Sequence, residues 1–307
     1  MKPEKEERQD RVNGNLVLIQ KIRGLTFGTD AYLLYAYMRP KPGGVAVELG
    51  AGSGIISFLA LTGKKFLHIH CVEIQAAYAG LIARNAAQNG LSDHVTIHAR
   101  DLRGMTAKEI AREADVVFAN PPYMPAGCGR ANRDEEKFIA RHEVFGGIGD
   151  FCKAAFRLLR HGGSFYLVYR PDRLSDLLFA LRTSGFEVKR MTFVHADCLH
   201  SPSLLLLEAK KGAKAGLYLT KPLFLYETDE KKGDRTGGEK DAAAGAIMCR
   251  ADRERARLRA GAYAEEEFSE TNKKCGQASR EPTDDIRYIY DNGAFPVSFE
   301  RPRGGSR

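Results

Sequence analysis

Residues 115–123 read Asp-Val-Val-Phe-Ala-Asn-Pro-Pro-Tyr. The apolar, β-branched run after Asp115 predicts a short buried strand. Prolines cannot donate to a sheet, so the strand ends at Asn120, and a residue that precedes a proline is biased toward an extended backbone. The turn that follows presents the Asn120 carboxamide, the Pro121 carbonyl and the Tyr123 ring. Ligands of open α/β sheets bind at the carboxyl ends of strands, and the plainer interpretation is a strand that ends in a proline-rich turn.

Apolar strand patterns alternate with helical patterns on both sides of this stretch. Strands are predicted at 45–49, 66–73, 94–99, 115–119, 164–169, 186–194 and 204–209. Helices are predicted at 55–61, 76–89, 108–113, 150–160 and 173–183, and His161-Gly-Gly is read as a stop. This alternation predicts an α/β fold with a doubly wound, mostly parallel, seven-stranded sheet. No helical pattern separates the last two strands, so we expect the last strand to run antiparallel.

The flanking segments define four predicted regions. Residues 1–44 form an N-terminal extension that packs on the core, in which 1–11 are frayed, 16–19 form a strand and 31–38 form a helix. Residues 45–226 are the main domain. Residues 227–285 are a charged, low-order insertion, because large apolar side chains are few there. Residues 286–307 are a C-terminal tail that is ordered at 286–290.

Composition narrows the class of protein. The chain has 307 residues with 43% hydrophobic content, a net charge of +8 and a pI of about 9.1. No apolar run approaches the ~20 residues of a membrane span, and the charged N-terminus does not resemble a secretory signal. Six scattered cysteines without a CxxC pair predict reduced thiols and no metal site. We therefore expect a cytoplasmic, monomeric protein with a polyanionic partner.

Three further positions predict a nucleotide-like cofactor. Gly50, Gly52 and Gly54 lie between a strand and a helix, where they bring backbone amides against a ligand. Glu73 ends the next strand, where a carboxylate suits a pair of ribose hydroxyls. Asp101 ends the third strand, where it could accept from an adenine amino group. The alternatives are a solvated acid at a strand end for Glu73 and an ordinary turn residue for Asp101.

These motifs resemble those of class I S-adenosylmethionine-dependent methyltransferases that act on planar nitrogens. The matching residues are Glu48-Leu-Gly-Ala-Gly-Ser-Gly54, Glu73, Asp101 and Asn120-Pro-Pro-Tyr123. Other segments are similar to the bacterial tRNA1(Val) adenine-N6 methyltransferases, namely Phe27-Gly-Thr-Asp30 with Leu33-Leu34, Ala140-Arg-His-Glu143, Tyr169-Arg-Pro171 and Pro222-Leu-Phe-Leu-Tyr226. The resemblance covers residues 14–226 and 286–290, whereas 227–285 depart from the compact family pattern.

The resemblance implies a cofactor, a partner and roles for individual residues. S-adenosylmethionine is the implied cofactor, tRNA the implied partner, and no metal is implied. Asn120 and Pro121 would hold the target amino group and Tyr123 would stack on the base. The implied cofactor-binding residues are Asp30, Glu48, Gly50, Gly52, Gly54, Glu73, Asp101 and Asn120. The loop that follows Tyr123 is rich in Gly and Arg, and it predicts substrate contacts by Arg130, Arg133, Arg141 and His142.

Several other functions stay open from the sequence. A protein glutamine-N5 methyltransferase also acts on a planar nitrogen, but such enzymes carry an N-terminal helical domain for which 44 residues leave no room. An rRNA guanine-N2 methyltransferase is another enzyme alternative. A non-catalytic RNA-binding protein with this fold would have no need of all three motifs. A NAD-dependent dehydrogenase is weakest, because no acid or base for a hydride site is evident.

Overall fold

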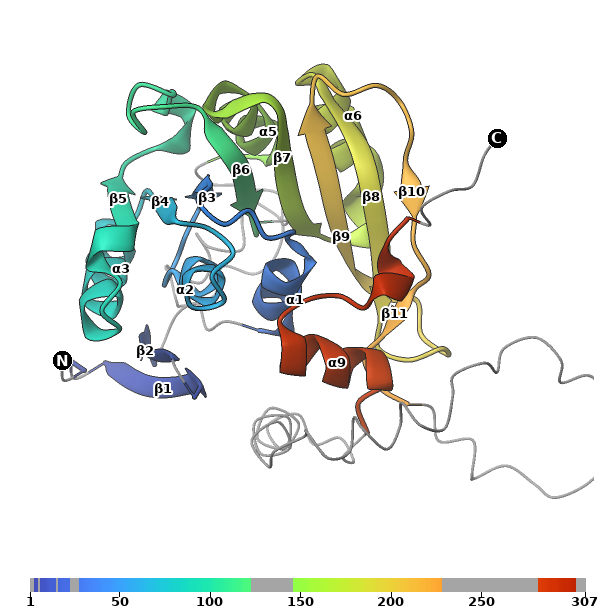
Figure 1. Cartoon of the computed structure of the whole chain (residues 1–307), viewed down its shortest axis with the longest axis horizontal. Coiled ribbons are helices and arrows are strands. Elements are labelled where there is room, and N and C mark those ends of the chain that lie inside the picture. Colours follow the sequence, from blue (N-terminus) through green and yellow to red (C-terminus); the bar gives the residue numbers. More distant parts are fainter. Residues whose placement is uncertain are drawn as a thin grey trace, which may run out of the picture.

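The computed structural model describes residues 3–4, 6–14, 16–22, 28–122, 146–227 and 281–301. Its centre is a twisted sheet whose strands run in the order β5-β4-β3-β6-β7-β9-β8 (Figure 1). Strand β9 is antiparallel to both of its neighbours, and the other adjacent pairs are parallel. The predicted sheet is therefore confirmed. The strands are β3 (Val45–Leu49), β4 (His68–Glu73), β5 (Val95–Ala99), β6 (Ala114–Ala119), β7 (Leu159–Tyr169), β8 (Phe186–His195) and β9 (Pro202–Lys211).

Two short strands extend this sheet at the β8 edge. Strands β10 (Tyr218–Leu219) and β11 (Leu223–Phe224) each pair in parallel with β8, so the central sheet has nine strands among the described residues. Neither was predicted, because a two-residue strand is too short to show an alternating pattern.

Helices cover both faces of the sheet. The first face carries α1 (Thr29–Tyr37), α2 (Ile55–Thr62), α3 (Ala76–Gln88) and α9 (Asp284–Asn292). The second face carries α5 (Ile148–Leu158) and α6 (Leu174–Thr183). Successive side chains of β6 alternate between these two cores: Val116 and Phe118 enter the first, Val117 and Ala119 the second. Short 3-10 helices lie at Ser92–His94, Leu102–Gly104, Pro171–Arg173 and Val297–Phe299.

The N-terminal segment differs from its prediction. Strand β1 (Glu7–Asn13) pairs with β2 (Leu16–Lys21) in a separate antiparallel hairpin, so the prediction of a frayed start was wrong for these residues. Both carboxylate oxygens of Glu7 accept from Arg84 on α3. Leu16 and Leu18 are fully buried against the first core. The prediction missed β1 because its charged sequence shows no alternating apolar pattern.

Two local predictions between the strands were wrong. Residues 108–113 form turns and bends instead of a helix, and the Glu109 side chain accepts from the Thr106 amide. Six residues are too few to offset the cost of helix nucleation without an apolar face. The His161-Gly-Gly segment lies inside β7, which follows α5 without a turn, and its glycines occupy a bulge in the pairing with β6.

The C-terminal segment completes the first core. Ile286 and Ile289 of α9 are fully buried, and so is Phe299. The Tyr290 ring stacks on Tyr32 of α1 with ring centroids 4.5 Å apart, and α9 lies beside α1 in Figure 1. Helix α9 begins at Asp284 because the Thr283 side chain caps it by accepting from the Ile286 amide.

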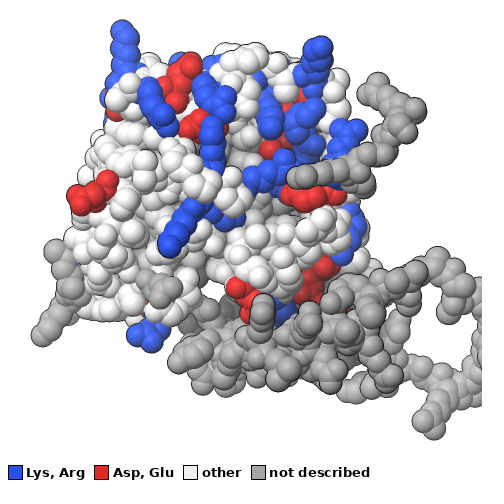
Figure 2. Space-filling view, in the orientation of Figure 1, with Lys and Arg blue, Asp and Glu red and all other residues white. Residues whose placement is uncertain are grey.

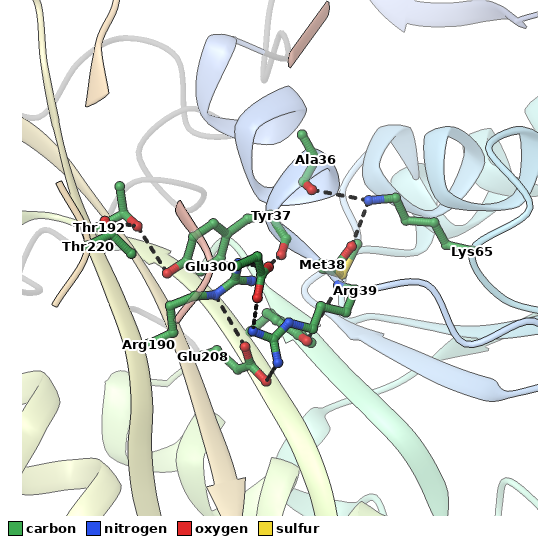
Figure 3. A network of polar contacts seen from close by, with 11 residues as sticks. Ala36, Tyr37, Met38, Arg39, Lys65, Arg190, Thr192, Glu208, Thr220 and Glu300 are labelled. Carbon is green, nitrogen blue, oxygen red and sulfur yellow. Dashed lines mark hydrogen bonds and ion pairs between the residues drawn. The ribbon is translucent and has the colours of Figure 1, made fainter. Parts of the chain in front are cut away.

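A buried polar network ties this segment to the sheet (Figure 3). Arg190 of β8 is 3% exposed and lies over the Tyr37 ring, with its guanidinium carbon 3.8 Å from the ring centroid. It donates to the Tyr37 carbonyl at 2.6 Å and to Glu300 at 3.0 Å. Its Nε lies 3.3 Å from Glu208 Oε2 on β9. Residues from β8, β9, α1 and the C-terminal segment therefore share one charged cluster.

The two described ends around residues 228–280 meet at a strand-like bridge. Tyr226 pairs with Pro282, and the Glu227 amide donates to the Glu281 carbonyl at 2.8 Å. This is the arrangement that flanks a two-residue hairpin turn. Residues 228–280 themselves lie outside the described residues, so the predicted insertion at 227–285 stays a prediction, with 281–285 now placed in the C-terminal segment.

We expect residues 228–280 to be replaceable by the dipeptide Asn-Gly. The shortened chain should stay monodisperse and melt within about 4 °C of the parent, because the joined ends are already paired. Thermal unfolding and gel filtration check this. A chain ending at Glu227 is the control and should be insoluble, because it also lacks the buried residues of α9. A shortened chain that aggregates would contradict the expectation.

Candidate active site

Adjacent strands bring the predicted site residues to one edge of the sheet. Leu49 of β3 pairs with Val72 of β4 and with Ala119 of β6, so Gly50, Glu73 and Asn120 follow at the same level. Strand β5 extends this edge, because Ala99 pairs with Glu73 and Asp101 comes two residues later. From β3 the chain continues to β4 on one side, and from β6 it continues to β7 on the other side. The carboxyl ends of β3 and β6 therefore form the topological switch point of the sheet.

The glycine loop adopts a backbone that only glycine takes without strain. Gly50, Gly52 and Gly54 have φ values of +70°, +53° and +81°. A Cβ on Gly54 would lie 2.7 Å from the Phe58 ring, so even alanine is excluded there. At these three positions the loop therefore presents backbone without side chains in front of α2, as a nucleotide-like ligand requires.

Glu73 connects this loop to the end of β4. Its Oε2 accepts from the Gly52 amide at 2.8 Å and its Oε1 from the Gln75 amide at 2.9 Å. Burial raises the pKa of this carboxyl, and the backbone hydrogen bonds oppose that rise. A carboxylate accepts about four hydrogen bonds, so ribose hydroxyls can join the amides.

Glu48 and Asp101 are occupied by neighbours within the chain. Glu48 is 2% exposed and accepts from the Ser57 amide and hydroxyl, and burial raises its pKa to about 8. It therefore holds the first turn of α2 beneath the loop. Asp101 accepts from the Arg103 amide at 2.8 Å, and the Arg103 side chain lowers its pKa. Binding of the cofactor by either residue stays a prediction.

Asn120 has a partner that the sequence did not indicate. Its Nδ2 donates to Asp30 Oδ2 at 2.8 Å, across 90 residues of chain. The prediction placed both residues near a cofactor without connecting them. The one available signal was that Asp30 lies in the first turn of a helix that begins directly after Gly28. Pro121 is buried beside Asn120, whereas Tyr123, Arg130, Arg133, Arg141 and His142 lie outside the described residues.

Neither a metal centre nor a membrane-spanning element occurs in the part of the chain that the structure describes. No group of three or more His, Cys, Asp or Glu side chains is arranged to hold a metal ion there. Over the same residues, no helix has both the length and the apolar character to cross a bilayer.

This combination of sheet order, glycine loop and acidic strand end defines a class I methyltransferase. Comparison with known families agrees with that conclusion. The chain belongs to the methyltransferase small domain family, whose sequence profile matches residues 25–179. S-adenosylmethionine is the methyl donor. Contact of its ribose with Glu73 at the glycine loop stays a prediction.

Individual relatives are more distant. A tRNA1(Val) (adenine(37)-N6)-methyltransferase from Phocaeicola vulgatus is 27% identical over 183 residues, which is 60% of this chain and 76% of that protein. An enzyme of the same name from Escherichia coli O157:H7 is 28% identical over 186 residues, which is 59% and 73% of the two chains. These relatives confirm the resemblance seen in the motifs. A predicted O-methyltransferase from Agrobacterium tumefaciens shares the fold, with a TM-score of 0.51, 21% identity and coverage of 66% and 90%.

We expect Glu73→Ala to weaken S-adenosylmethionine binding about 10- to 100-fold, the scale of lost hydrogen bonds to a charged group. The change removes the acceptor for the ribose and also releases the Gly52 amide. Titration calorimetry measures the affinity. Glu109→Ala is the matched control, because it removes an acid that binds Thr106 away from the strand end. Unchanged affinity for the Glu73 variant would contradict the assignment.

Proposed function

We propose that the protein methylates N6 of an adenine in tRNA, with an anticodon-loop adenine as the target. The names of the curated relatives support the tRNA and the atom. The Asn-Pro-Pro-Tyr motif supports an amino group on a planar ring as the acceptor. The observation that carries the proposal is the Asn120 carboxamide at the switch point, with its NH₂ held by Asp30.

The residues present can activate such an amino group by position alone. The lone pair of an adenine amino nitrogen is delocalised into the ring, so the nitrogen is a poor nucleophile. Asn120 Oδ1 and the Pro121 carbonyl would each accept one N–H, which holds the nitrogen partly pyramidal and directs its lone pair. Bound S-adenosylmethionine supplies the electrophilic methyl group. The methylated nitrogen then loses a proton to water, so the chain needs no strong base.

The target adenine must leave the stacked bases of the tRNA before the active site can reach its amino group. Enzymes that modify bases act on extruded or single-stranded nucleotides, and anticodon-loop bases are inexpensive to extrude. Tyr123 directly follows the two prolines and would stack on the extruded base, which is worth about 1–3 kcal/mol. Phosphate contacts by Arg130, Arg133, Arg141 and His142 belong to the same proposal.

The charge distribution supports an anionic partner without locating its contact. The net charge is +8. Lys and Arg gather in the upper half of the face shown in Figure 2, where β6 and β7 begin in Figure 1. Part of this charge is paired, since Lys41, Arg112 and Arg160 all contact Asp115. That region lies at the edge of the sheet away from Asn120.

The direct test is incubation with bulk tRNA and methyl-labelled S-adenosylmethionine, followed by digestion and mass spectrometry of the nucleosides. N6-methyladenosine is the expected product. N2-methylguanosine from added rRNA would favour the guanine enzyme instead. Label in a protein glutamine, with none in RNA, would favour the glutamine enzyme. A protein that binds tRNA and S-adenosylmethionine but transfers no methyl group would be the non-catalytic alternative.

A further inference from the structure

Asp30 and Asn120 meet although they come from different layers of the fold. Asp30 is in the first turn of α1, which covers the first face, and Asn120 follows β6 in the central sheet. The bond between Asn120 Nδ2 and Asp30 Oδ2 is 2.8 Å long. The other oxygen, Oδ1, accepts from the Ala31 amide at 2.9 Å. One carboxylate therefore joins the start of α1 to the end of β6.

This contact determines which way the Asn120 carboxamide faces. A carboxylate accepts hydrogen bonds and has none to donate, so the side of Asn120 that faces it must be the NH₂ group. The oxygen, Oδ1, is then on the side turned away from Asp30. Without the partner, a half-turn of the amide would exchange donor and acceptor at little energetic cost.

Gly28 makes room for the carboxylate. Its φ of −122° and ψ of −175° are extended, so its backbone conformation does not require glycine. A Cβ there would instead lie 2.9 Å from Asp30 Oδ1. That oxygen could move only by giving up the Ala31 amide or the approach to Asn120. The glycine is thus explained by the Asp30 side chain.

Helix α1 is a rigid support for Asp30. The Lys65 ammonium is buried and donates to the carbonyls of Tyr35, Ala36 and Met38 at the far end of the helix. Tyr32, two residues after Asp30, stacks on Tyr290 and donates to its carbonyl at 3.0 Å. Side chains on well-packed helices hold a geometry more narrowly than side chains on loops.

We propose that Asp30 is a positioning residue for methyl transfer, which acts by holding Asn120 with its oxygen toward the target amino group. The proposal rests on the proposed transfer to an amino nitrogen and adds to it a residue that need not touch cofactor or substrate. The negative charge of Asp30 also polarises the carboxamide and makes Oδ1 a stronger acceptor. Gly28 contributes by leaving the space that this arrangement needs.

Single-turnover methylation of tRNA by four variants tests the proposal. Asp30→Ala should lower the rate about 10- to 100-fold with unchanged S-adenosylmethionine affinity, the scale of a misplaced reacting group. Asp30→Asn should lose about 2- to 10-fold, because its amide can also donate to Asn120 Oδ1 and occupy the acceptor. Gly28→Ala should be slower than the parent for the same reason as Asp30→Ala. Asp284→Ala, which removes a first-turn acid from α9, is the control and should react at the parental rate.

A double variant separates the positioning of Asn120 from the bond of Asp30 to the Ala31 amide. Asn120→Ala combined with Asp30→Ala should be no slower than Asn120→Ala alone, because Asp30 acts only through that carboxamide. Multiplicative losses, or an Asp30→Ala variant with the parental rate, would overturn the proposal. So would a rate loss that is matched by a loss of S-adenosylmethionine affinity, since Asp30 would then serve the cofactor directly.

A measurement without substrate keeps the proposal independent of the tRNA assignment. The side-chain amide resonance of Asn120, identified by its loss in Asn120→Ala, should shift in the ¹⁵N–¹H spectra of Asp30→Ala and Asp30→Asn. If the parent methylates no tRNA but this resonance shifts in the variants, the proposed tRNA substrate is wrong, whereas the positioning of the Asn120 carboxamide by Asp30 is supported. If the parent methylates tRNA and the resonance stays in place in both variants, the positioning role fails.

Discussion

Asn120→Ala is expected to lower kcat about 10²-fold or more, with little change in the affinity for S-adenosylmethionine. The carboxamide oxygen accepts an N–H from the target, and this hydrogen bond matters most as the nitrogen becomes pyramidal. Its loss therefore falls on the transition state. The Gly50–Gly54 loop and Glu73 stay in place, because neither has a hydrogen bond to Asn120 among those described.

Single-turnover methylation at saturating cofactor and tRNA isolates this step from product release. Asn292→Ala is the matched control, since it removes the same carboxamide from the exposed end of α9. If the Asn120 variant methylates tRNA at the parental rate, the Asn-Pro-Pro-Tyr motif is only a turn and has no role in catalysis. A large rise in the Kd for S-adenosylmethionine would instead assign Asn120 to the cofactor.

The second large effect is on stability: Arg190→Met should lower the free energy of unfolding by about 3–5 kcal/mol. Arg190 is 3% exposed and Glu208 is 1% exposed. Removing the guanidinium leaves a buried carboxylate whose other described cation, Arg39, is 3.9 Å away. The change also releases Glu300 and the Tyr37 carbonyl.

Urea unfolding of three variants checks this value. Arg190→Met with Glu208→Leu should recover most of the loss, because replacing both buried charges leaves none unpaired. Arg39→Met is the matched control from the same cluster and should cost about 1 kcal/mol or less, because that side chain is 46% exposed. A double variant as unstable as Arg190→Met would show that the arginine contributes mainly through packing on Tyr37.

Local patterns predicted the central sheet because its strands are apolar runs bounded by glycine, proline and charged residues. Val45–Leu49 was predicted with its observed bounds, and α3 within one residue. Strand β1 was missed because its charged sequence has no alternating apolar pattern, although it pairs with the adjacent β2 and its Glu7 also contacts Arg84, 77 residues away. The helix predicted at 108–113 does not form, because Ile110 is the only buried side chain in that segment and six residues offer no apolar face.

In the site, too, the residues that local patterns mark were predicted, and the contacts that depend on packing of distant segments were not. Gly50, Glu73 and Asn120 are recognisable because each follows a strand, and parallel strands necessarily end at one edge. The pairing of Asp30 with Asn120 depends on where α1 packs on the first face of the sheet, which no local pattern encodes. Glu48 was expected to contact the cofactor. No local pattern indicated that the Ser57 hydroxyl, nine positions further along the chain, would donate a hydrogen bond to its carboxyl group.

The packing of α9 on α1 bears on when the protein becomes complete during synthesis. Tyr32 and Tyr290 are 258 positions apart. At about 5–20 residues per second, roughly 13 to 50 s pass between their additions to the growing chain. In the last part of that interval, after Phe224 of β11 has been added, the nascent chain contains every strand of the sheet, but its Asp30-bearing helix still lacks its stacking partner. Methyl transfer should therefore begin only after α9 has been made and has packed on α1, and products that terminate before α9 should expose an uncovered aromatic surface to chaperones.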